Sequence, residues 1–323
     1  THKNLIYKLI DNRITRIFRP KIDRFLASTK LGLSLYNLIA NQQSPLIRHY
    51  LHSQSSKSLY NYSIDFKKDF FVLNFVNGKV NIPLRSEHSG FDWDAALSVL
   101  GHDVEVKEVY RIYLCVVTSP RFFDIGANFG THTALFLANQ AEVYSFEPLP
   151  QCKAYFFDLC QVNDWEYHNW HEIGLSDKDG IVTLTYPKGQ EWLATIGTPI
   201  IQNQQKQEYL QSNEIKIACL DNFQLNYKNA LLKIDTEGHE LSVLNGAYKS
   251  KINESFGIVF ESNVTQDRDQ IMSIANKLDF CILELRLTKL RLLNSDQFIA
   301  STATNFFMGS DHSCKILIEN WRL

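Results

Sequence analysis

The sequence predicts an α/β fold with three layers, in which helices cover both faces of a mostly parallel sheet. Two observations carry this prediction. From residue 121 onward, short apolar stretches typical of buried strands alternate with longer segments whose apolar residues have helical spacing. A glycine-containing turn joins the first of these strands to the first helix. Such alternation forms parallel βαβ units, and the late strands are expected to supply an antiparallel edge.

The composition is that of an ordered globular protein. Of the 323 residues, 45% are hydrophobic and 21% are charged, and the net charge is −2. No apolar run approaches the roughly 18 residues that a membrane span requires, so an integral membrane protein is not expected. The six cysteines are scattered and form no C-x-x-C pair, which favours reduced thiols over a zinc site or a disulfide scaffold. These observations predict a cytoplasmic protein.

Residues 1–68 are predicted to form a basic helical extension. They hold 12 Lys and Arg against three Asp, so this segment carries +9 and the rest of the chain −11. Apolar residues from Leu5 to Phe18 recur at helical spacing, and Pro20 ends the pattern. The favoured interpretation is an arm packed on an acidic catalytic domain. The alternative is docking to an anionic surface or carrier, which would make the protein peripheral to a membrane.

Residues 69–120 are predicted to hold a β-hairpin and a helical lead-in. Strands at residues 70–75 and 80–84 flank Asn77-Gly78, a pair that tolerates the positive φ of a tight turn. Residues 93–117 are apolar enough for one or two helices. This segment leads into the domain that carries the motifs.

Residues 121–323 are predicted to be the cofactor-binding domain. Strands are expected, in chain order, at residues 122–125, 142–146, 167–175, 181–186, 215–220, 231–235, 257–261, 280–285 and 306–309. Helices are expected at residues 131–139, 151–162, 240–248 and 267–278. The glutamine-rich segment 189–213 is interpreted as an active-site flap in which Trp192 covers the substrate, with a surface excursion as the alternative.

The first strand of this domain ends in a glycine turn, residues 124–131. In an open parallel sheet, the carboxyl end of a strand and the N-terminus of the next helix offer backbone N–H groups to a ligand. Glu147-Pro148 ends the next strand, where the carboxylate can accept hydrogen bonds from both hydroxyls of a ribose. The predicted cofactor cradle consists of Asp124, Gly126, Ala127, Asn128, Gly130, Thr131, Glu147 and Pro148.

The glycines also indicate which cofactor binds. A dinucleotide fingerprint aligned on Gly126 needs glycine at two positions that hold Asn128 and Thr131 here, and no G-K-[ST] of a P-loop follows. S-adenosylmethionine has no phosphates. Its cationic tail suits Asp124, and its ribose suits Glu147. S-adenosylmethionine is therefore the predicted cofactor, and an NAD-dependent oxidoreductase is disfavoured.

Three further sequence motifs come after the glycine turn and after Phe146-Glu147-Pro148 along the chain. They are Gly174-Leu175-Ser176-Asp177, Leu232-Lys233-Ile234-Asp235-Thr236-Glu237-Gly238-His239-Glu240 and Val243-Leu244-Asn245-Gly246-Ala247. In this combination the chain resembles the FkbM family of S-adenosylmethionine-dependent methyltransferases, over roughly residues 121–263. The resemblance implies a class I methyltransferase sheet, the turn and Glu147 as the cofactor cradle, and O-methylation of a hydroxyl on a sugar or secondary metabolite.

The chemistry is expected where Asp235, Glu237 and His239 follow their strand. Lys233 shares a strand face with Asp235, and Glu261 ends a strand that should reach the same rim. Methyl transfer to a hydroxyl requires an aligned nucleophile and a base, and His239 is the first candidate base because its ordinary pKa is near neutrality. Asp235 and Glu237 are the further catalytic candidates. Lys233 is interpreted as the ion-pair partner of Asp235, and Glu261 as a substrate contact.

The sequence leaves alternatives open for the metal requirement, for the methyl acceptor and for whether the protein is a catalyst. Carboxylates at this rim could orient a hydroxyl pair through Mg²⁺, but nothing in their spacing demands a metal, and none is expected. The acceptor is expected to be a small molecule, a glycosylated compound or a peptide. The alternative to O-methylation is N-methylation of a peptide or amide side chain docked by the basic arm. Nucleic acid is not expected as a substrate, because no D-P-P-Y motif is present. A non-catalytic cofactor-binding scaffold is disfavoured by the intact Glu147 and Asp235.

Overall fold

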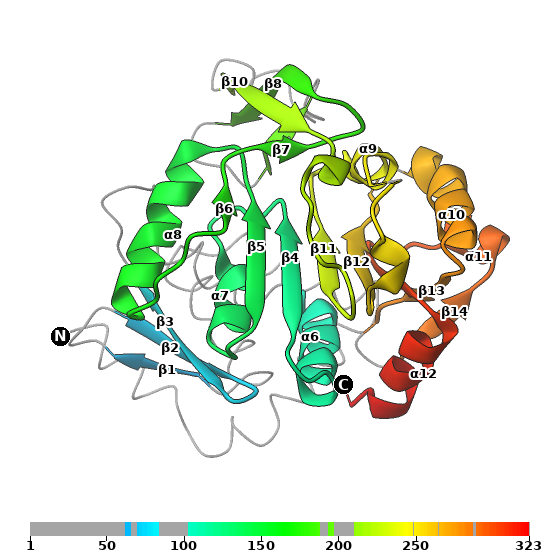
Figure 1. Ribbon diagram of the computed structural model, residues 1–323. Helices are drawn as coiled ribbons and strands as arrows, with labels where there is room; N and C mark the ends of the chain where they lie inside the picture. Colours follow the sequence, from blue (N-terminus) through cyan, green and yellow to red (C-terminus); the bar gives the residue numbers. More distant parts are fainter. Residues whose placement is uncertain are drawn as a thin grey trace, which may run out of the picture.

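The structure of this chain is a computed structural model. It describes residues 62–65, 70–83, 103–187, 193–196, 210–247, 249–263, 265–286 and 289–322. Within these ranges the strands form three sheets, the largest of which runs through the centre of the molecule (Figure 1). The predicted basic arm, apart from residues 62–65, lies outside the described residues, as do Trp192 and most of the segment 189–213.

The central sheet has eight strands in the order β14-β13-β15-β12-β11-β4-β5-β6. Their bounds are β4 (Arg121–Ile125), β5 (Glu142–Phe146), β6 (Trp170–His171), β11 (Leu231–Ile234), β12 (Gly257–Glu261), β13 (Cys281–Glu284), β14 (Arg291–Leu293) and β15 (Asn305–Gly309). From β6 to β12 every pairing is parallel. The antiparallel strand β15 lies between β12 and β13, and antiparallel β14 forms the edge. The predicted mostly parallel sheet is confirmed, with one antiparallel strand inside it as well as one at its edge.

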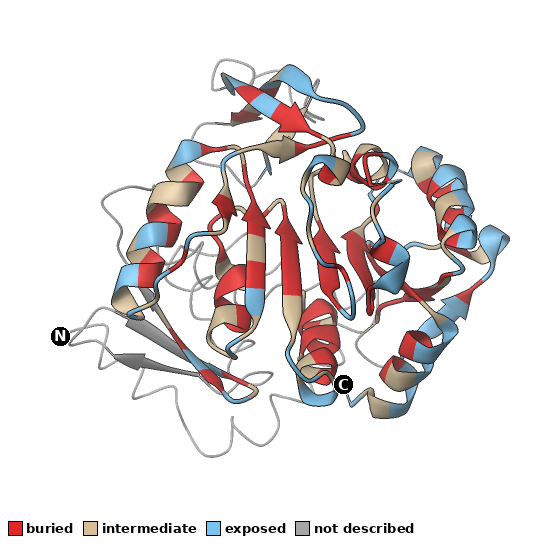
Figure 2. Ribbon diagram, in the orientation of Figure 1, coloured by how far each residue is buried: buried red, intermediate tan, exposed pale blue. Residues whose placement is uncertain are grey.

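Helices cover both faces of this sheet, which gives the three predicted layers. One apolar core joins alternate strand residues such as Phe122 to α6 (Val104–Val116), α7 (Thr131–Leu137), α8 (Pro150–Val162) and α12 (Asp311–Asn320). The other core joins the intervening residues, such as Phe123, to α9 (Glu240–Asn245), α10 (Arg268–Lys277) and α11 (Ser295–Ile299). Adjacent strand residues thus point to opposite layers. Figure 2 shows buried residues along the central strands and on the inward sides of the helices.

A small antiparallel sheet precedes the central one. It contains β1 (Tyr62–Asp65), β2 (Phe70–Phe75) and β3 (Gly78–Pro83). The predicted hairpin is therefore confirmed and gains a third strand. Its tight turn lies one residue earlier than expected, because Val76, with φ of 54°, takes the left-handed conformation and Gly78 begins β3. Asn139 fixes the hairpin to α7 by donating to the Phe75 carbonyl at 3.0 Å.

The third sheet has the order β7-β10-β8-β9. It contains β7 (Gly174–Leu175), β8 (Gly180–Pro187), β9 (Thr195–Ile196) and β10 (Leu210–Ala218). The sequence predicts one strand over residues 167–175, but the chain there changes from the central sheet at β6 to this sheet at β7. The apolar pattern is continuous from β6 to β7, so the sequence does not show where the chain passes from one sheet to the other.

Arg268 begins α10 and is 2% exposed. Its guanidinium donates hydrogen bonds to the backbone carbonyls of Ser262, Phe298, Ser301 and Ala303 at 2.6–3.1 Å. It also lies 5.3 Å from the ring centre of Phe298 and 5.0 Å from that of Phe306. One buried cation therefore satisfies backbone carbonyls after β12, in α11 and in the loop that leads into β15.

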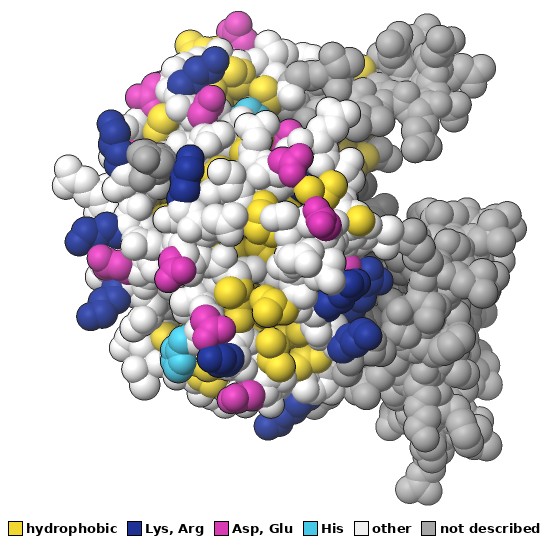
Figure 3. All heavy atoms as spheres, turned by 90° about the vertical axis from the view of Figure 1, so that its right-hand side faces the viewer, with side chains coloured by type: hydrophobic (Ala, Val, Ile, Leu, Met, Phe, Trp, Pro, Cys, Tyr) yellow, Lys and Arg dark blue, Asp and Glu magenta, His cyan; other side chains and the backbone are white. Residues whose placement is uncertain are grey.

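Figure 3 shows the face formed by the C-terminal part of the chain, where hydrophobic side chains are interspersed with charged ones. The exposed apolar side chains of β14, α11 and α12 are Leu292, Ile299 and Ile318. Strand β14 and helices α11 and α12 were not predicted from the sequence. No helix in the described part of the chain has the length and apolarity needed to cross a bilayer.

Candidate active site

The glycine turn connects β4 to α7 and contains three residues in the left-handed region. Gly126, Asn128 and Gly130 have φ values of 76°, 49° and 71°. A Cβ atom on Gly126 would lie 1.9 Å from the backbone oxygen of Asp235, and one on Gly130 would lie 2.1 Å from the ring of Phe156. The two glycines therefore allow other parts of the chain to approach the turn closely.

Most backbone N–H groups of the turn are already bonded within the protein. Gly126 and Ala127 both donate to the Phe146 carbonyl, at 3.0 and 3.1 Å, and Gly130 donates to the Ala127 carbonyl at 2.8 Å. Thr131, at the start of α7, is partly exposed. The turn is therefore held rigidly at the carboxyl end of β4, adjacent to the end of β5.

Glu147 follows β5 and clamps the turn. Its Oε2 accepts from the N–H of Asn128 at 3.0 Å, and its Oε1 accepts from the N–H of Leu149 at 2.9 Å. Burial raises the pKa of Glu147 to about 7, although these two N–H groups and Lys233 oppose that shift. Each carboxylate oxygen keeps a second lone pair, so the group retains the capacity to accept two hydroxyl donors such as those of a ribose. Pro148, next in the chain, is partly buried.

Asp124, the other acid of the predicted cofactor cradle, is completely buried. Its Oδ2 accepts from the N–H of Thr133 at 3.0 Å and from the Thr133 hydroxyl at 2.7 Å. Its Oδ1 has no hydrogen-bond partner in the described part of the chain and lies 3.9 Å from Lys233 Nζ. This placement favours a role in holding α7 behind the turn. Direct contact with a cofactor stays a prediction.

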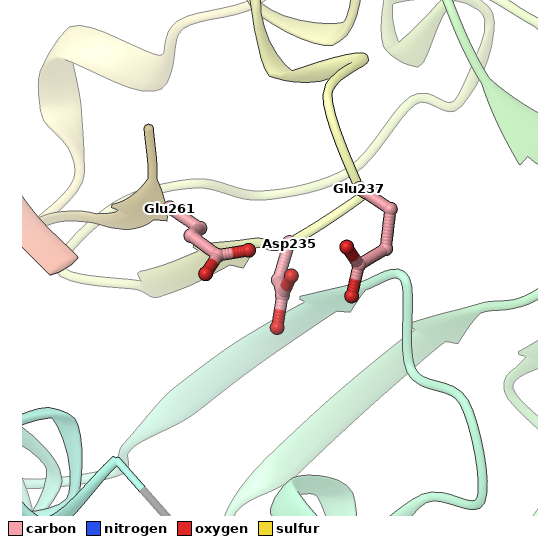
Figure 4. Close-up of side chains that lie close together, drawn as sticks. All are labelled: Asp235, Glu237 and Glu261. Atoms are coloured by element: carbon pink, nitrogen blue, oxygen red, sulfur yellow. The ribbon is translucent and has the colours of Figure 1, made fainter. Parts of the chain in front are cut away.

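Three carboxylates gather where β11 and β12 end. One oxygen from each of Asp235, Glu237 and Glu261 lies within 4.8 Å of the others, and Figure 4 shows the three side chains close together beyond the strand ends. Such closeness lets carboxylates share one proton or contact one cation. Burial and the neighbouring acids raise the pKa of Glu237 to about 7 and that of Glu261 to about 9. The predicted meeting of these residues at one rim is confirmed.

Lys233 forms an ion pair with one member of this group, Asp235. Its Nζ lies 3.0 Å from Asp235 Oδ2, as expected from their shared strand face. Burial lowers the pKa of Lys233, but Asp235 and Asp124 outweigh it and the net shift is upward. Asp235 is thus held beside a permanent cation, whereas Glu237 and Glu261 form no ion pair in the described part of the chain.

Glu240 shapes the loop between β11 and α9. Its Oε1 accepts from the N–H of Thr236 at 2.9 Å, from the Thr236 hydroxyl at 3.1 Å and from the N–H of Gly238 at 3.1 Å. Glu237, between these donors, has a φ of 53° in the left-handed region. Thr195 also donates to the Glu237 carbonyl at 3.0 Å. A non-glycine residue is therefore held in an uncommon conformation by contacts on both sides.

His239 lies at the N-cap position of α9, where the sequence placed it. Its Nε2 is 2.8 Å from the Ser176 hydroxyl, at the end of β7. Burial lowers the pKa of His239, with Asp177 opposing the shift, and the net effect favours the neutral ring. The ring is engaged by Ser176 and is not part of the carboxylate group. Its catalytic role stays a prediction.

A family comparison adds an independent observation to this geometry. The family model described as "Methyltransferase FkbM domain" matches residues 124–290, which is just over half of the chain. The chain belongs to the FkbM methyltransferase family. The matched segment begins at the glycine turn and contains Glu147, Asp235, Glu237 and Glu261.

Two individual proteins resemble this FkbM methyltransferase. Over 143 residues it is 29% identical to the "Hexuronic acid methyltransferase AglP" of Haloferax volcanii, a match that covers 42% of this chain and 54% of AglP. The chain thus spans about half the length of that curated relative. The solved structure of precorrin-6y C5,15-methyltransferase from Geobacter metallireducens matches 64% of this chain and 85% of its own, with 10% identity and a TM-score of 0.31.

Residues outside the matched FkbM segment also reach the rim. Asn305, which pairs with Glu261 in the sheet register, donates to Asp103 Oδ1 and Glu105 Oε1, both at 3.0 Å. The two acids lie at the start of α6, which precedes the domain. Sequence reasoning missed them, and no local signal could have found them, because the contacts join residues 200 or more positions apart.

His132 follows the glycine turn in the first turn of α7. Its ring is partly buried, and its Nδ1 lies 3.0 Å from the hydroxyl of Tyr110 on α6. Burial, Lys233 and Lys107 lower the pKa of His132 well below its ordinary value. A neutral imidazole therefore lies next to the glycine turn of the FkbM domain.

Proposed function

We propose that this FkbM methyltransferase transfers a methyl group from S-adenosylmethionine to a hydroxyl of a sugar or a glycosylated metabolite. The proposal is carried by one arrangement. The glycine turn after β4 has Glu147 on one side, after β5, and the carboxylates of β11 and β12 on the other. A cofactor cradle and a set of proton-accepting groups therefore flank the same turn.

The residues present fit this cofactor. Glu147 offers two oxygens with free lone pairs, which suits the two hydroxyls of a ribose, and the turn contains no phosphate-binding glycine pattern. When bound, S-adenosylmethionine supplies an electrophilic methyl group on a sulfonium. The protein's part is to hold the acceptor in line, exclude water and remove the acceptor proton.

The sugar class is supported by the relative and by the rim. AglP is named for a hexuronic acid, and this chain resembles it over about half of that protein's length. The carboxylates of the rim are hydrogen-bond acceptors suited to hydroxyl donors. Removal of a proton from a hydroxyl also requires a base, which the rim contains.

Isothermal titration of the full chain with S-adenosylhomocysteine, with NAD as the comparison ligand, tests the cofactor. We expect binding of S-adenosylhomocysteine alone, and selective binding of NAD would contradict the proposal. Methyl glycosides of glucose, galactose, rhamnose and glucuronic acid, together with an asparagine-containing peptide, then test the acceptor by mass spectrometry. Methylation of the peptide alone would replace oxygen by nitrogen as the acceptor atom. Parallel assays with EDTA and with Mg²⁺ test the expectation that no metal is required.

A further inference from the structure

The acids and the histidine that follow β11 differ in the hydrogen bonds and ion pairs that they already form within the protein. Asp235 is paired with Lys233 at 3.0 Å, and His239 is bonded to Ser176 at 2.8 Å. The Oε1 of Glu240 accepts three hydrogen bonds from the loop. In the described part of the chain, no hydrogen bond or ion pair to the Glu237 carboxylate is found. Glu237 is therefore the group of this loop whose carboxylate is available to a substrate.

We propose that Glu237 accepts the proton of the acceptor hydroxyl, and that Glu240 is a positioning residue that holds Glu237 in place. This inference rests on the proposed function. Glu240 binds the N–H groups on both sides of Glu237 and thereby fixes its left-handed backbone. One carboxylate oxygen of Glu237 then lies within 4.8 Å of one oxygen from each of Asp235 and Glu261 (Figure 4).

The step is balanced within this arrangement. The acceptor oxygen gains the methyl group while its O–H bond breaks, and the sulfonium sulfur keeps the electron pair of the broken S–C bond. The proton goes to an Oε atom of Glu237 and leaves to solvent after the product departs. No oxidant, reductant or metal is needed for this balance.

The three acids of the carboxylate group differ in the charged groups that lie near them. The charged groups around Glu237 are Lys233 on β11, Asp235 just after β11, Glu240 on α9, Glu261 on β12 and Asp103 just before α6. Lys233 forms an ion pair with Asp235, whereas Glu261 has no such cation and its pKa rises to about 9. The pKa of Glu237, about 7, is lower than that of Glu261 and close to neutrality, where a general base is most effective.

The test compares Glu237→Gln with the wild type on whichever glycoside the wild type methylates fastest. We expect turnover to fall about 100-fold or more, with the dissociation constant for S-adenosylhomocysteine changed less than twofold. The rise of wild-type turnover with pH near 7 should be lost. Glu254→Gln, at an exposed acid outside the site, is the matched control and should behave as the wild type.

Two further variants separate positioning and the rival base. Glu240→Ala should lower turnover, and Glu240→Gln should restore it, because the amide oxygen can accept the same three hydrogen bonds. If His239→Gln abolishes the pH-dependent limb while Glu237→Gln keeps it, the base is His239 and the inference is overturned. Wild-type turnover by Glu237→Gln also overturns it, while leaving the methyltransferase function intact. A wild type that binds S-adenosylhomocysteine but methylates no glycoside instead refutes the proposed acceptor, and the inference with it.

Discussion

The ammonium of Lys233 lies 3.0 Å from Oδ2 of Asp235 at the end of β11, and only 7% of the lysine side chain is exposed. The same ammonium is 3.9 Å from Oδ1 of Asp124, which has no hydrogen bond in the described part of the chain. A single buried cation therefore lies between the strand that leads into the glycine turn and the strand that leads into the carboxylate group. This ion pair links the two halves of the site.

Replacing this cation should be costly. Lys233→Met leaves the buried Asp124 and the partly buried Asp235 without a counterion, and we expect a loss of about 3–5 kcal/mol in the free energy of unfolding. Urea denaturation measures it. Lys251→Met removes an exposed lysine that pairs with Glu254, and should leave the urea midpoint nearly unchanged. Equal urea midpoints for the wild type, Lys233→Met and Lys251→Met would show that the ion pair of Lys233 does not stabilise the fold.

Glu147→Ala should weaken binding of S-adenosylhomocysteine. The substitution removes both the acceptors proposed for the ribose and the clamp on Asn128, so we expect a loss of about 1–3 kcal/mol in binding free energy by calorimetry. Glu172→Ala, at an exposed acid paired with Lys153, is the control. Unchanged affinity in Glu147→Ala would remove the ribose assignment.

Gly126→Ala should destabilise the fold itself. The new Cβ would lie 1.9 Å from the Asp235 carbonyl, and the backbone has a φ of 76°. We expect a loss of at least about 3 kcal/mol in unfolding free energy. Gly180→Ala is the matched control, because its Cβ would meet Ile217 only at 3.9 Å. If both alanine variants unfold at the same denaturant concentration, the close approach at Gly126 is not required.

Arg268→Lys should be damaging although the charge is kept. A lysine cannot reproduce the planar fork that reaches four backbone carbonyls, so we expect a loss of about 2–4 kcal/mol. Thermal unfolding followed by circular dichroism measures this loss. The exposed Arg291→Lys supplies the comparison, and a similar melting temperature for both variants would contradict the proposed importance of the fork.

The carboxylate group should make stability fall as pH rises. The pKa of Glu261 in the folded protein is about 9, above the value of about 4.3 expected in an unfolded chain, so the folded state binds more protons between these limits. Stability is therefore lost as pH rises through this window. Glu261→Gln removes that loss and should unfold several degrees above the wild type at pH 8.5, with a smaller difference at pH 5.5. A difference that shrinks at higher pH would contradict the shift.

Much of the domain was predictable because its signals are local. The strand before Gly126, the helix after Gly130 and the strand that ends before Glu147 follow from short apolar runs and their punctuation. The meeting of Asp235 with Glu261 follows from the rule that parallel strands end at one rim. These predictions needed no knowledge of distant contacts.

What could not be predicted depends on long-range packing. The approach of Asp103 to Asn305 joins residues 202 positions apart, and the contact of His239 with Ser176 joins two sheets. The change of sheet between β6 and β7 leaves the apolar pattern unbroken. Each of these contacts contributes to the site, yet none leaves a mark in the local sequence.

The position of β15 between β12 and β13 has a consequence for how the chain is made. Strand β13 is synthesised before β15, but β13 pairs with β15 and not with β12. The C-terminal strands of the sheet therefore cannot pair in the order in which they are synthesised. Until residues 305–309 are available, the β12 edge that carries Glu261 stays open to pairing with another chain. Translation stopped at residue 290 would supply the whole family segment and still leave this gap. Residues 291–322 thus complete the sheet beside Glu261.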